Sequence, residues 1–147
     1  MQRIISSFKI NILLFCLLTV LSASGQTFFE PFSKASFNKF WTVESESPDY
    51  SYSFIHDTLE ITAPKGLTLW FRQKMSGDLV IDYDACIVNE RAGDRLSDLN
   101  CFWMASDRDA KDIWKRMKWR SGIFNRCYSL QTYYLGYGGN SNKTTRF

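Results

Sequence analysis

The sequence predicts an all-β protein with a jelly-roll β-sandwich fold, and three observations support this prediction. Aromatic residues make up 16% of the chain, and glycine or proline interrupts it at intervals that suit strands better than long helices. Several segments alternate apolar and polar residues with the period of a half-buried strand. Because such strands must bury their apolar faces and little helix is predicted, two packed sheets are the simplest arrangement.

The first 25 residues have the layout of a secretory signal peptide. Arg3 and Lys9 precede an apolar run over residues 10–21, and the small residues Ala23 and Gly25 follow it. This run is too short to span a bilayer comfortably. We expect cleavage after Gly25, which leaves one β-sandwich domain over residues 26–147 in the periplasm or outside the cell, with no membrane span.

Charge and cysteine content narrow the classes of partner. Cleavage removes two basic residues and lowers the formal net charge from +3 to +1, which argues against nucleic acid as a partner. The one basic run, KRMKWR at 115–120, is interpreted as a solvent-exposed face. Cys86, Cys101 and Cys127 have no zinc-motif spacing, and we expect buried free thiols rather than a Cys101–Cys127 disulfide.

Alternation of apolar and polar residues locates the strands. The predicted strands cover residues 57–64, 66–73, 79–88, 97–106 and 127–137. The first two are expected to pair as a hairpin. Between Ser106 and Gly122 the alternation stops, and apolar residues at helical spacing predict a short helix or an ordered loop. The turn after Tyr137 leads into one more strand, which begins at Thr144.

Three of these strands carry a second face that is polar and aromatic. This face comprises Asp82, Asp84, Asn100, Phe102, Gln131 and Tyr133. Aromatic rings stack on the C–H faces of sugars, while carboxylates and amides bind pairs of hydroxyl groups. The pattern therefore predicts a surface that binds a polysaccharide or an oligosaccharide.

Catalysis by this face is a weaker prediction, with two alternatives. Asp82 and Asp84 could share a substrate, but IDYDACIVNE does not match the ExDxxE pattern of glucanases, and a structural calcium ion is an equal use for them. A lyase would need a base, for which Tyr133 is the candidate, and a group to hold a uronate carboxylate, such as Arg95, Arg146 or Asn100. His56 lies at a predicted turn and is interpreted as solvated.

The candidate site residues follow from these considerations. The candidate catalytic residues are Asp82, Asp84 and Tyr133. The candidate substrate-binding residues are Arg95, Asp98, Asn100, Phe102, Gln131, Tyr137, Asn140 and Arg146. No metal-ligand set is predicted, and no cofactor other than the structural calcium ion is expected.

Several long stretches resemble a known family. DRLSDLNCFWMASD, SGIF, SLQTYYLGYGGNSN and TTRF resemble a family of secreted bacterial proteins in the concanavalin A-like lectin/glucanase superfamily, over residues 66–147. The resemblance implies the jelly-roll fold. It also implies association with the degradation of plant polysaccharides, notably pectin and rhamnogalacturonan, in Bacteroidetes. It assigns no catalytic residue.

The resemblance also bears on how the chain ends. In that family TTRF is followed by further strands, so we expect this chain to be the N-terminal part of a larger domain; the alternative is a short, complete sandwich. We expect an exported carbohydrate-active protein, related to polysaccharide lyases or glycoside hydrolases, that acts on plant cell-wall polysaccharide. The alternatives are a non-catalytic glycan-binding module and an inactive fragment. The sequence gives no indication of oligomeric state.

Overall fold

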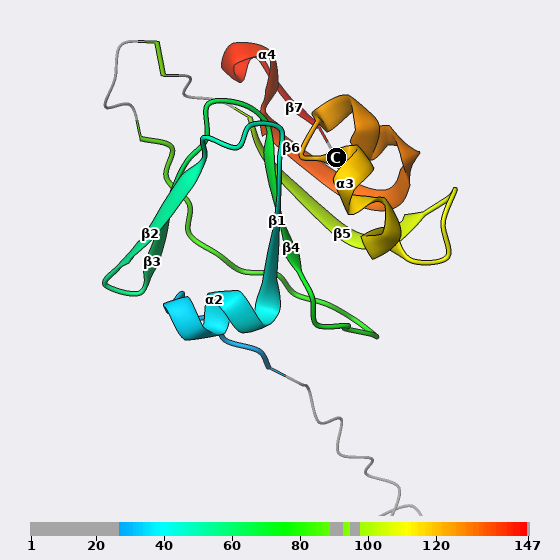
Figure 1. Ribbon diagram of the computed structural model, residues 1–147, viewed down its shortest axis with the longest axis horizontal. Coiled ribbons are helices and arrows are strands. Elements are labelled where there is room, and N and C mark those ends of the chain that lie inside the picture. The colour runs from blue at the N-terminus through cyan, green and yellow to red at the C-terminus, as the bar shows by residue number, and fades with distance from the viewer. Residues whose placement is uncertain (1–26, 89–92, 95–97, 147) are drawn as a thin grey trace, which may run out of the picture. The chain divides into compact units, whose positions relative to one another are not determined.

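The computed structural model describes residues 27–88, 93–94 and 98–146 (Figure 1). The chain divides into two compact units, Met1–Glu30 and Pro31–Phe147. Every helix and strand discussed below belongs to the second unit. The predicted signal peptide and Arg95 lie outside the described residues.

The described part of the second unit consists mostly of strands in three small antiparallel sheets. Its strands are β1 (Trp41–Ser45), β2 (Ser51–Ile55), β3 (Thr58–Thr62), β4 (Leu67–Phe71), β5 (Leu99–Asp107), β6 (Leu130–Gly138) and β7 (Thr144–Arg146). Its helices are α2 (Lys34–Phe40), η1 (Ile113–Arg116), α3 (Met117–Arg120), η2 (Phe124–Ser129) and α4 (Gly139–Asn142). The all-β class is therefore confirmed, while the jelly-roll arrangement stays a prediction.

The first four strands form one long hairpin that bends in the middle. β1 pairs with β4, from Trp41 opposite Phe71 onward, and β2 pairs with β3, from Ser51 opposite Thr62 onward. His56 and Asp57, both with positive φ, make the tip, as a two-residue hairpin turn requires. Residues 46–50 lie opposite residues 63–66, so the two sides are unequal, and the hairpin turns a corner there (Figure 1).

This hairpin corrects the predicted pairing of residues 57–64 with residues 66–73. Both segments are strands, but each pairs with an earlier segment of the chain rather than with the other. Alternation identifies a strand and its faces, whereas the choice of partner depends on contacts that alternation does not encode. His56 lies in the turn, as predicted.

Helix α2 covers one face of the β2–β3 arm. Ser33 and Ser36 form a capping box that fixes the start of the helix. The buried Phe37 then packs against Tyr52, with ring centroids 4.8 Å apart, and against Phe54 at 5.4 Å. The two β2 residues are two apart, so they lie on the same face of the strand.

The predicted strand over residues 79–88 is wrong. This segment is not part of any of the sheets formed by the described residues, and its side chains are exposed. Asp82 and Asp84 therefore lie on an exposed stretch outside the sheets. Leu79, Ile81 and Tyr83, which form the apolar side of the alternation, line a pocket together with side chains of β5 and β6.

The third sheet has the order β5–β6–β7 and confirms the strands predicted around residues 97–106 and 127–137. Its β5–β6 ladder puts Trp103 opposite Tyr133 and Phe102 opposite Tyr134, and it shifts register at a bulge between Trp103 and Ser106. Alternation along both strands gives the sheet two faces. We call the face with Asn100, Phe102 and Tyr134 the inner face. The outer face comprises Cys101, Trp103, Tyr133, Leu135 and Tyr137.

The inner face contributes to the hydrophobic core. Phe102 lies 6.4 Å from Trp70 of β4 between ring centroids. Trp70 clusters with Cys127 and Leu130, and the cluster is flanked by Ala105, Ile113 and Trp114. The segment between Ser106 and Gly122 holds η1 and α3, in agreement with the predicted short helix.

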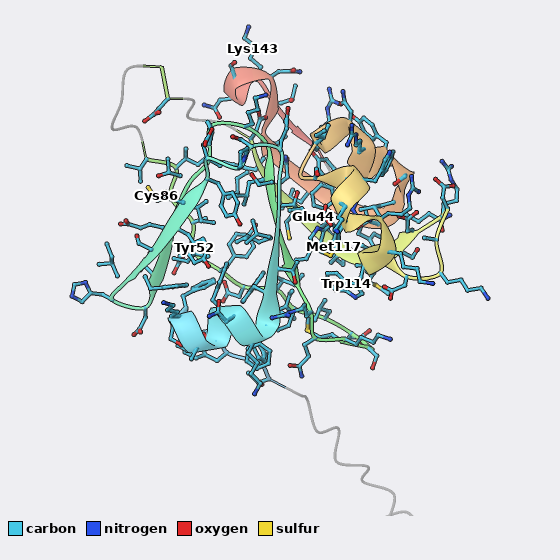
Figure 2. The ribbon with its side chains drawn as sticks, in the orientation of Figure 1. Glu44, Tyr52, Cys86, Trp114, Met117 and Lys143 are labelled. Atoms are coloured by element: carbon cyan, nitrogen blue, oxygen red, sulfur yellow. The ribbon has the colours of Figure 1, made fainter. Side chains whose placement is uncertain are left out.

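A buried arginine joins three parts of this unit. Arg120, which ends α3, has no exposed surface, and its Nη2 donates to Glu44 Oε1 of β1 at 2.6 Å. Its Nε donates to Glu44 Oε2 at 3.2 Å and its Nη1 to Asp107 Oδ2 of β5 at 3.3 Å. Figure 2 shows Glu44 beside Met117, where α3 begins. The interpretation of residues 115–120 as a wholly solvent-exposed face is therefore wrong at Arg120.

Gly66 in the hairpin corner and Gly122 just after α3 allow these two segments to approach each other closely. Gly122 has φ +67°, and a Cβ there would lie 2.6 Å from the Glu44 carbonyl oxygen and 2.8 Å from the Gly66 carbonyl oxygen. Backbone atoms cannot yield as a flexible side chain can. The close contact beside Glu44 therefore requires glycine at this position.

The three cysteines of the described residues are free thiols. The prediction of buried thiols holds for Cys127, whereas Cys101 is half-buried and Cys86 is exposed. Burial, with a smaller contribution from the Glu44 carboxylate, raises the pKa of Cys127. Its thiol therefore resists deprotonation.

Replacing the buried arginine should destabilise the protein strongly. Arg120→Met leaves the buried Glu44 carboxylate without its partner and Asp107 with Arg116 alone, and we expect the free energy of unfolding to fall by about 3–5 kcal/mol in urea denaturation. Lys65→Met removes an ion pair with Glu46 at 3.8 Å whose lysine side chain is 61% exposed, and should cost less than about 1 kcal/mol. Equal losses in the two variants would contradict the central role of Arg120.

Substitution of the contact glycine provides an independent test of the same junction. Gly122→Ala should lower the free energy of unfolding by about 2–5 kcal/mol, because the new methyl group meets backbone atoms and φ is positive. Gly77→Ala is the matched control, since Gly77 also has positive φ but has no atom within 4 Å of the new Cβ. It should cost about 1 kcal/mol. A Gly122 variant no less stable than the Gly77 variant would refute the close contact.

Cysteine reactivity should follow burial. Iodoacetamide at mildly alkaline pH should label Cys86 first and Cys127 last, as measured by peptide mass spectrometry. The folded-state pKa of Cys127 exceeds its unfolded value, so its contribution to stability is complete below the unfolded pKa and declines as the pH rises toward the folded pKa. Equal labelling rates for the two thiols in the folded protein would show that Cys127 is accessible.

Candidate functional site

The outer face of β5–β6 presents aromatic rings to solvent. Trp103 and Tyr133 lie directly opposite each other in the ladder, with ring centroids 5.7 Å apart and ring planes 14° from parallel. Tyr133 is 61% exposed and Tyr137, four residues further along the same face, is 62% exposed. Two strands thus hold several ring surfaces at the spacing that the sheet imposes.

A pocket of about 240 Å³ lies next to these rings. Its walls are Leu79, Ile81, Tyr83, Cys101, Trp103 and Leu135. Partial burial, together with the neighbouring Cys101 thiol, raises the pKa of Tyr83. The pocket offers apolar contacts with one polar group at its edge, which suits a ligand with C–H surfaces and hydroxyl groups.

The structure separates the predicted site residues of the two central strands. Tyr133 and Tyr137 lie on the outer face. Asn100 and Phe102 lie on the inner face, where the Tyr134 hydroxyl donates to Asn100 Oδ1 at 2.9 Å and the Phe102 ring lies 5.2 Å from the Tyr134 ring. These inner-face residues are engaged in packing. The predicted common face for Asn100, Phe102 and Tyr133 is therefore wrong.

The same alternation that defined the strands explains this error. Asn100 and Phe102 occupy even positions, whereas Trp103 and Tyr133 are directly opposite each other in the ladder at odd positions. A sequence pattern gives the two faces of each strand but not which faces of neighbouring strands coincide, because that depends on register. The apolar face with Cys101 and Trp103, which the pattern favours for the core, is the one that carries the exposed rings.

The other predicted residues are distributed over the unit. Gln131 is exposed and pairs with Ser106, beyond the bulge. Asp98 and Asn140 lie near the end of β6, where the Asp98 amide donates to the Gly138 carbonyl at 3.3 Å. Arg146 and Asn100 both pair with Gly136, from β7 and β5 respectively. Asp82 and Asp84 lie on the exposed segment outside the sheets.

This distribution bears on the predicted lyase chemistry. The candidate base, Tyr133, projects from the outer face. Asn100 and Arg146 flank Gly136 in register, which assigns them to the inner face. In a lyase, the base and the group that binds the carboxylate must both reach the same uronate unit of the substrate. The described residues do not bring these three side chains together.

A second, larger cleft lies at the hairpin corner, and the sequence reasoning missed it. It has a volume of about 430 Å³ and includes Glu46, Tyr50, Met117 and Lys118 in its walls. Its floor contains Glu44, whose carboxylate is already bound by Arg120. No periodic pattern marks it, because its walls come from the end of β1, the loop after it and a short helix, which only the folded chain brings together.

Neither a metal site nor a membrane span is evident in the part of the chain that the structure describes. Within residues 27–88, 93–94 and 98–146, no three His, Cys, Asp or Glu side chains group as metal ligands. None of the helices in those ranges has the length and hydropathy needed to cross a membrane.

Comparison with protein-family models identifies a match for more than half of the chain. The model of DUF6250, a domain of unknown function, matches residues 61–147, from within β3 to the end of the chain. No curated protein and no solved structure matches the sequence. The matched stretch is 87 of the 147 residues and contains both faces of the β5–β6–β7 sheet as well as Arg120. The chain therefore belongs to the DUF6250 family.

Proposed function

We propose that this chain is an exported glycan-binding protein that acts in the turnover of plant cell-wall polysaccharide, and that the outer face of β5–β6 is its binding surface. The observation that supports the proposal is the exposed aromatic set on that face. Trp103 and Tyr133 form a nearly parallel cross-strand pair, and Tyr137 extends the row. The pocket beside them supplies further apolar contacts.

Ring geometry explains why a sugar suits this surface. Tyr and Trp have an apolar ring for contact and a polar tip for a hydrogen bond, so they suit ligands that are partly apolar and partly hydroxylated. A sheet holds successive rings on one face at fixed spacing, and a polysaccharide also repeats at fixed spacing. Contacts to several sugar units would then add along the chain.

Binding is better supported than catalysis. A stacking surface requires rings but neither an acid nor a base, and the contacts on the outer face are of this kind. Of the three candidates to hold a uronate carboxylate for a lyase with Tyr133 as base, Asn100 and Arg146 are assigned by the ladder to the other face, and Arg95 lies outside the described residues. The glycan-binding module is therefore our proposal, and a lyase or hydrolase relationship belongs to the wider protein context that the sequence resemblance implies.

The wider context is part of the proposal. The signal-peptide layout of residues 1–25 supports export to the periplasm or the exterior. The resemblance of residues 66–147 to concanavalin A-like proteins supports a jelly-roll domain and a plant polysaccharide, such as pectin or rhamnogalacturonan, as ligand. A uronate polymer incubated with the protein and monitored by ultraviolet absorbance for unsaturated products would detect lyase activity.

Removal of one exposed ring tests the proposed surface. Tyr133→Ala should weaken retention of the protein by plant cell-wall polysaccharide in affinity electrophoresis by about twofold to tenfold, the effect of about 0.5–1.5 kcal/mol for one aromatic contact. The side chain is 61% exposed, so folding should be unaffected. Phe29→Ala is the control with a neutral galactan as ligand, because Phe29 is 80% exposed but lies outside the outer face.

The outcomes separate clearly. Loss of galactan retention in the Tyr133 variant alone supports the outer face as the binding surface. Equal retention of the Tyr133 variant and the unaltered protein would exclude it. No retention of the unaltered protein by any plant cell-wall glycan would refute the proposed function as a whole.

A further inference from the structure

Helix α3 and its flanking turns carry a second exposed aromatic cluster, and this one is basic. Residues 108–126 contain seven of the chain's 18 lysine and arginine residues, against two aspartates. Two large aromatic side chains are exposed in the same stretch, Trp119 at 43% and Phe124 at 41%, and Tyr128, just after it, is 72% exposed. Figure 2 shows nitrogen-tipped side chains projecting around α3. We call Lys115, Lys118, Trp119, Arg126 and Tyr128 the α3 patch.

The ring of Trp119 is held by two guanidinium groups. The Arg116 guanidinium carbon lies 4.0 Å from the ring centroid and that of Arg126 lies 5.6 Å from it. Arg126 also donates to the Trp119 carbonyl. Arg116 is fixed in turn by Asp107 at 3.0 Å and Asp109 at 2.6 Å. Trp119 is therefore fixed in place although much of it faces solvent, which lowers the entropy cost of using it to bind a ligand.

The two lysines of the patch differ from Arg116 and Arg120 in their exposure and in their ion pairing. Lys115 and Lys118 are exposed, three residues apart on adjoining helical turns. Neither forms an ion pair with a carboxylate of residues 27–88, 93–94 or 98–146, whereas Arg116 and Arg120 are both neutralised by aspartate or glutamate. The positive charge that faces solvent here is thus carried by the lysines, with Arg126 beside them.

An acidic polysaccharide matches this combination of groups. A polyuronate repeats one carboxylate and one sugar ring in every unit, so that cations and aromatic rings placed close together can each find a partner. Nucleic acid presents a denser row of charges and needs a larger basic surface than two free lysines and one arginine. A neutral glycan would leave the lysines without a function.

We infer that the α3 patch binds the uronate units of an acidic polysaccharide, as a second contact surface distinct from the outer face. This inference rests on the proposed glycan-binding function and specifies the charge class of its ligand. Lys115 and Lys118 would pair with carboxylates, while Tyr128 and the exposed edge of Trp119 would contact sugar rings. Binding at the patch would weaken as salt is added, because exposed ion pairs are screened.

The test compares polygalacturonate with a neutral galactan by affinity electrophoresis of the purified full chain. The double variant Lys115→Ala/Lys118→Ala should bind polygalacturonate about tenfold more weakly at low ionic strength, as the loss of two exposed ion pairs implies, and its affinity should depend less on salt. Tyr128→Ala should also weaken binding to polygalacturonate. The lysine double variant should bind galactan as the unaltered protein does.

A charge-matched control excludes a general effect of net charge. Lys34→Ala/Lys74→Ala removes two exposed lysines from other parts of the unit and should leave the affinity for polygalacturonate within about twofold. An equal loss in the two double variants would overturn the inference. All of these side chains are exposed, so the variants should fold, and a thermal transition like that of the unaltered protein confirms it.

The remaining outcomes distinguish this inference from the proposed function. Retention on galactan that depends on Tyr133, with no preference for polygalacturonate, would refute the α3 patch and keep the proposed function. Tighter binding to single-stranded DNA than to polygalacturonate would identify the patch as a nucleic-acid surface and refute the inference. Failure to bind either polysaccharide would refute both.

Discussion

The buried ion pairs of Arg120 are the interaction on which the rest of this unit depends. Its guanidinium bonds to Glu44 of β1 and Asp107 of β5 from the end of α3, so that one side chain joins the hairpin, the helix and the central sheet. Its remaining bond, to the Ile113 carbonyl at 2.8 Å, ties it to η1. A charge without exposed surface is tolerated only when such bonds are complete, so these elements must assemble together.

This junction also assigns the two faces of the β5–β6 sheet. The junction lies beside Trp70, whose ring centroid is 5.4 Å from the Arg120 guanidinium carbon, and Trp70 in turn packs against Phe102 of the inner face. The inner face therefore packs in the hydrophobic core. Trp103, Tyr133 and Tyr137 are left on the other face, where the rings of Trp103 and Tyr133 stack on each other. The position of the candidate glycan surface thus follows from where the core forms.

Sequence reasoning predicted the parts of this fold that depend on local periodicity. It identified β3, β4, β5 and β6 and the helical segment between residues 106 and 122, because each has an apolar stripe with its own period. Sequence reasoning was wrong where the structure of a segment depends on contacts with residues far away in the sequence. Residues 79–88 alternate like a strand but lie outside the sheets, β3 and β4 pair with earlier strands, and Arg120 looks like any other residue of a basic run. Glu44 and Arg120 are 76 residues apart, and no short pattern links them.

Asp107 connects the buried core with the basic surface. Its Oδ2 accepts from Arg120 inside the protein, while its Oδ1 accepts from Arg116, whose guanidinium lies against Trp119. The carboxylate is itself buried, so neither bond is weakened by competing water. The Asp109 and Asp107 carboxylates together raise the pKa of Arg116, with the Asp109 hydrogen bond contributing most. The ring at the centre of the α3 patch is therefore positioned through a short chain of bonds that begins at the same arginine that holds the fold together.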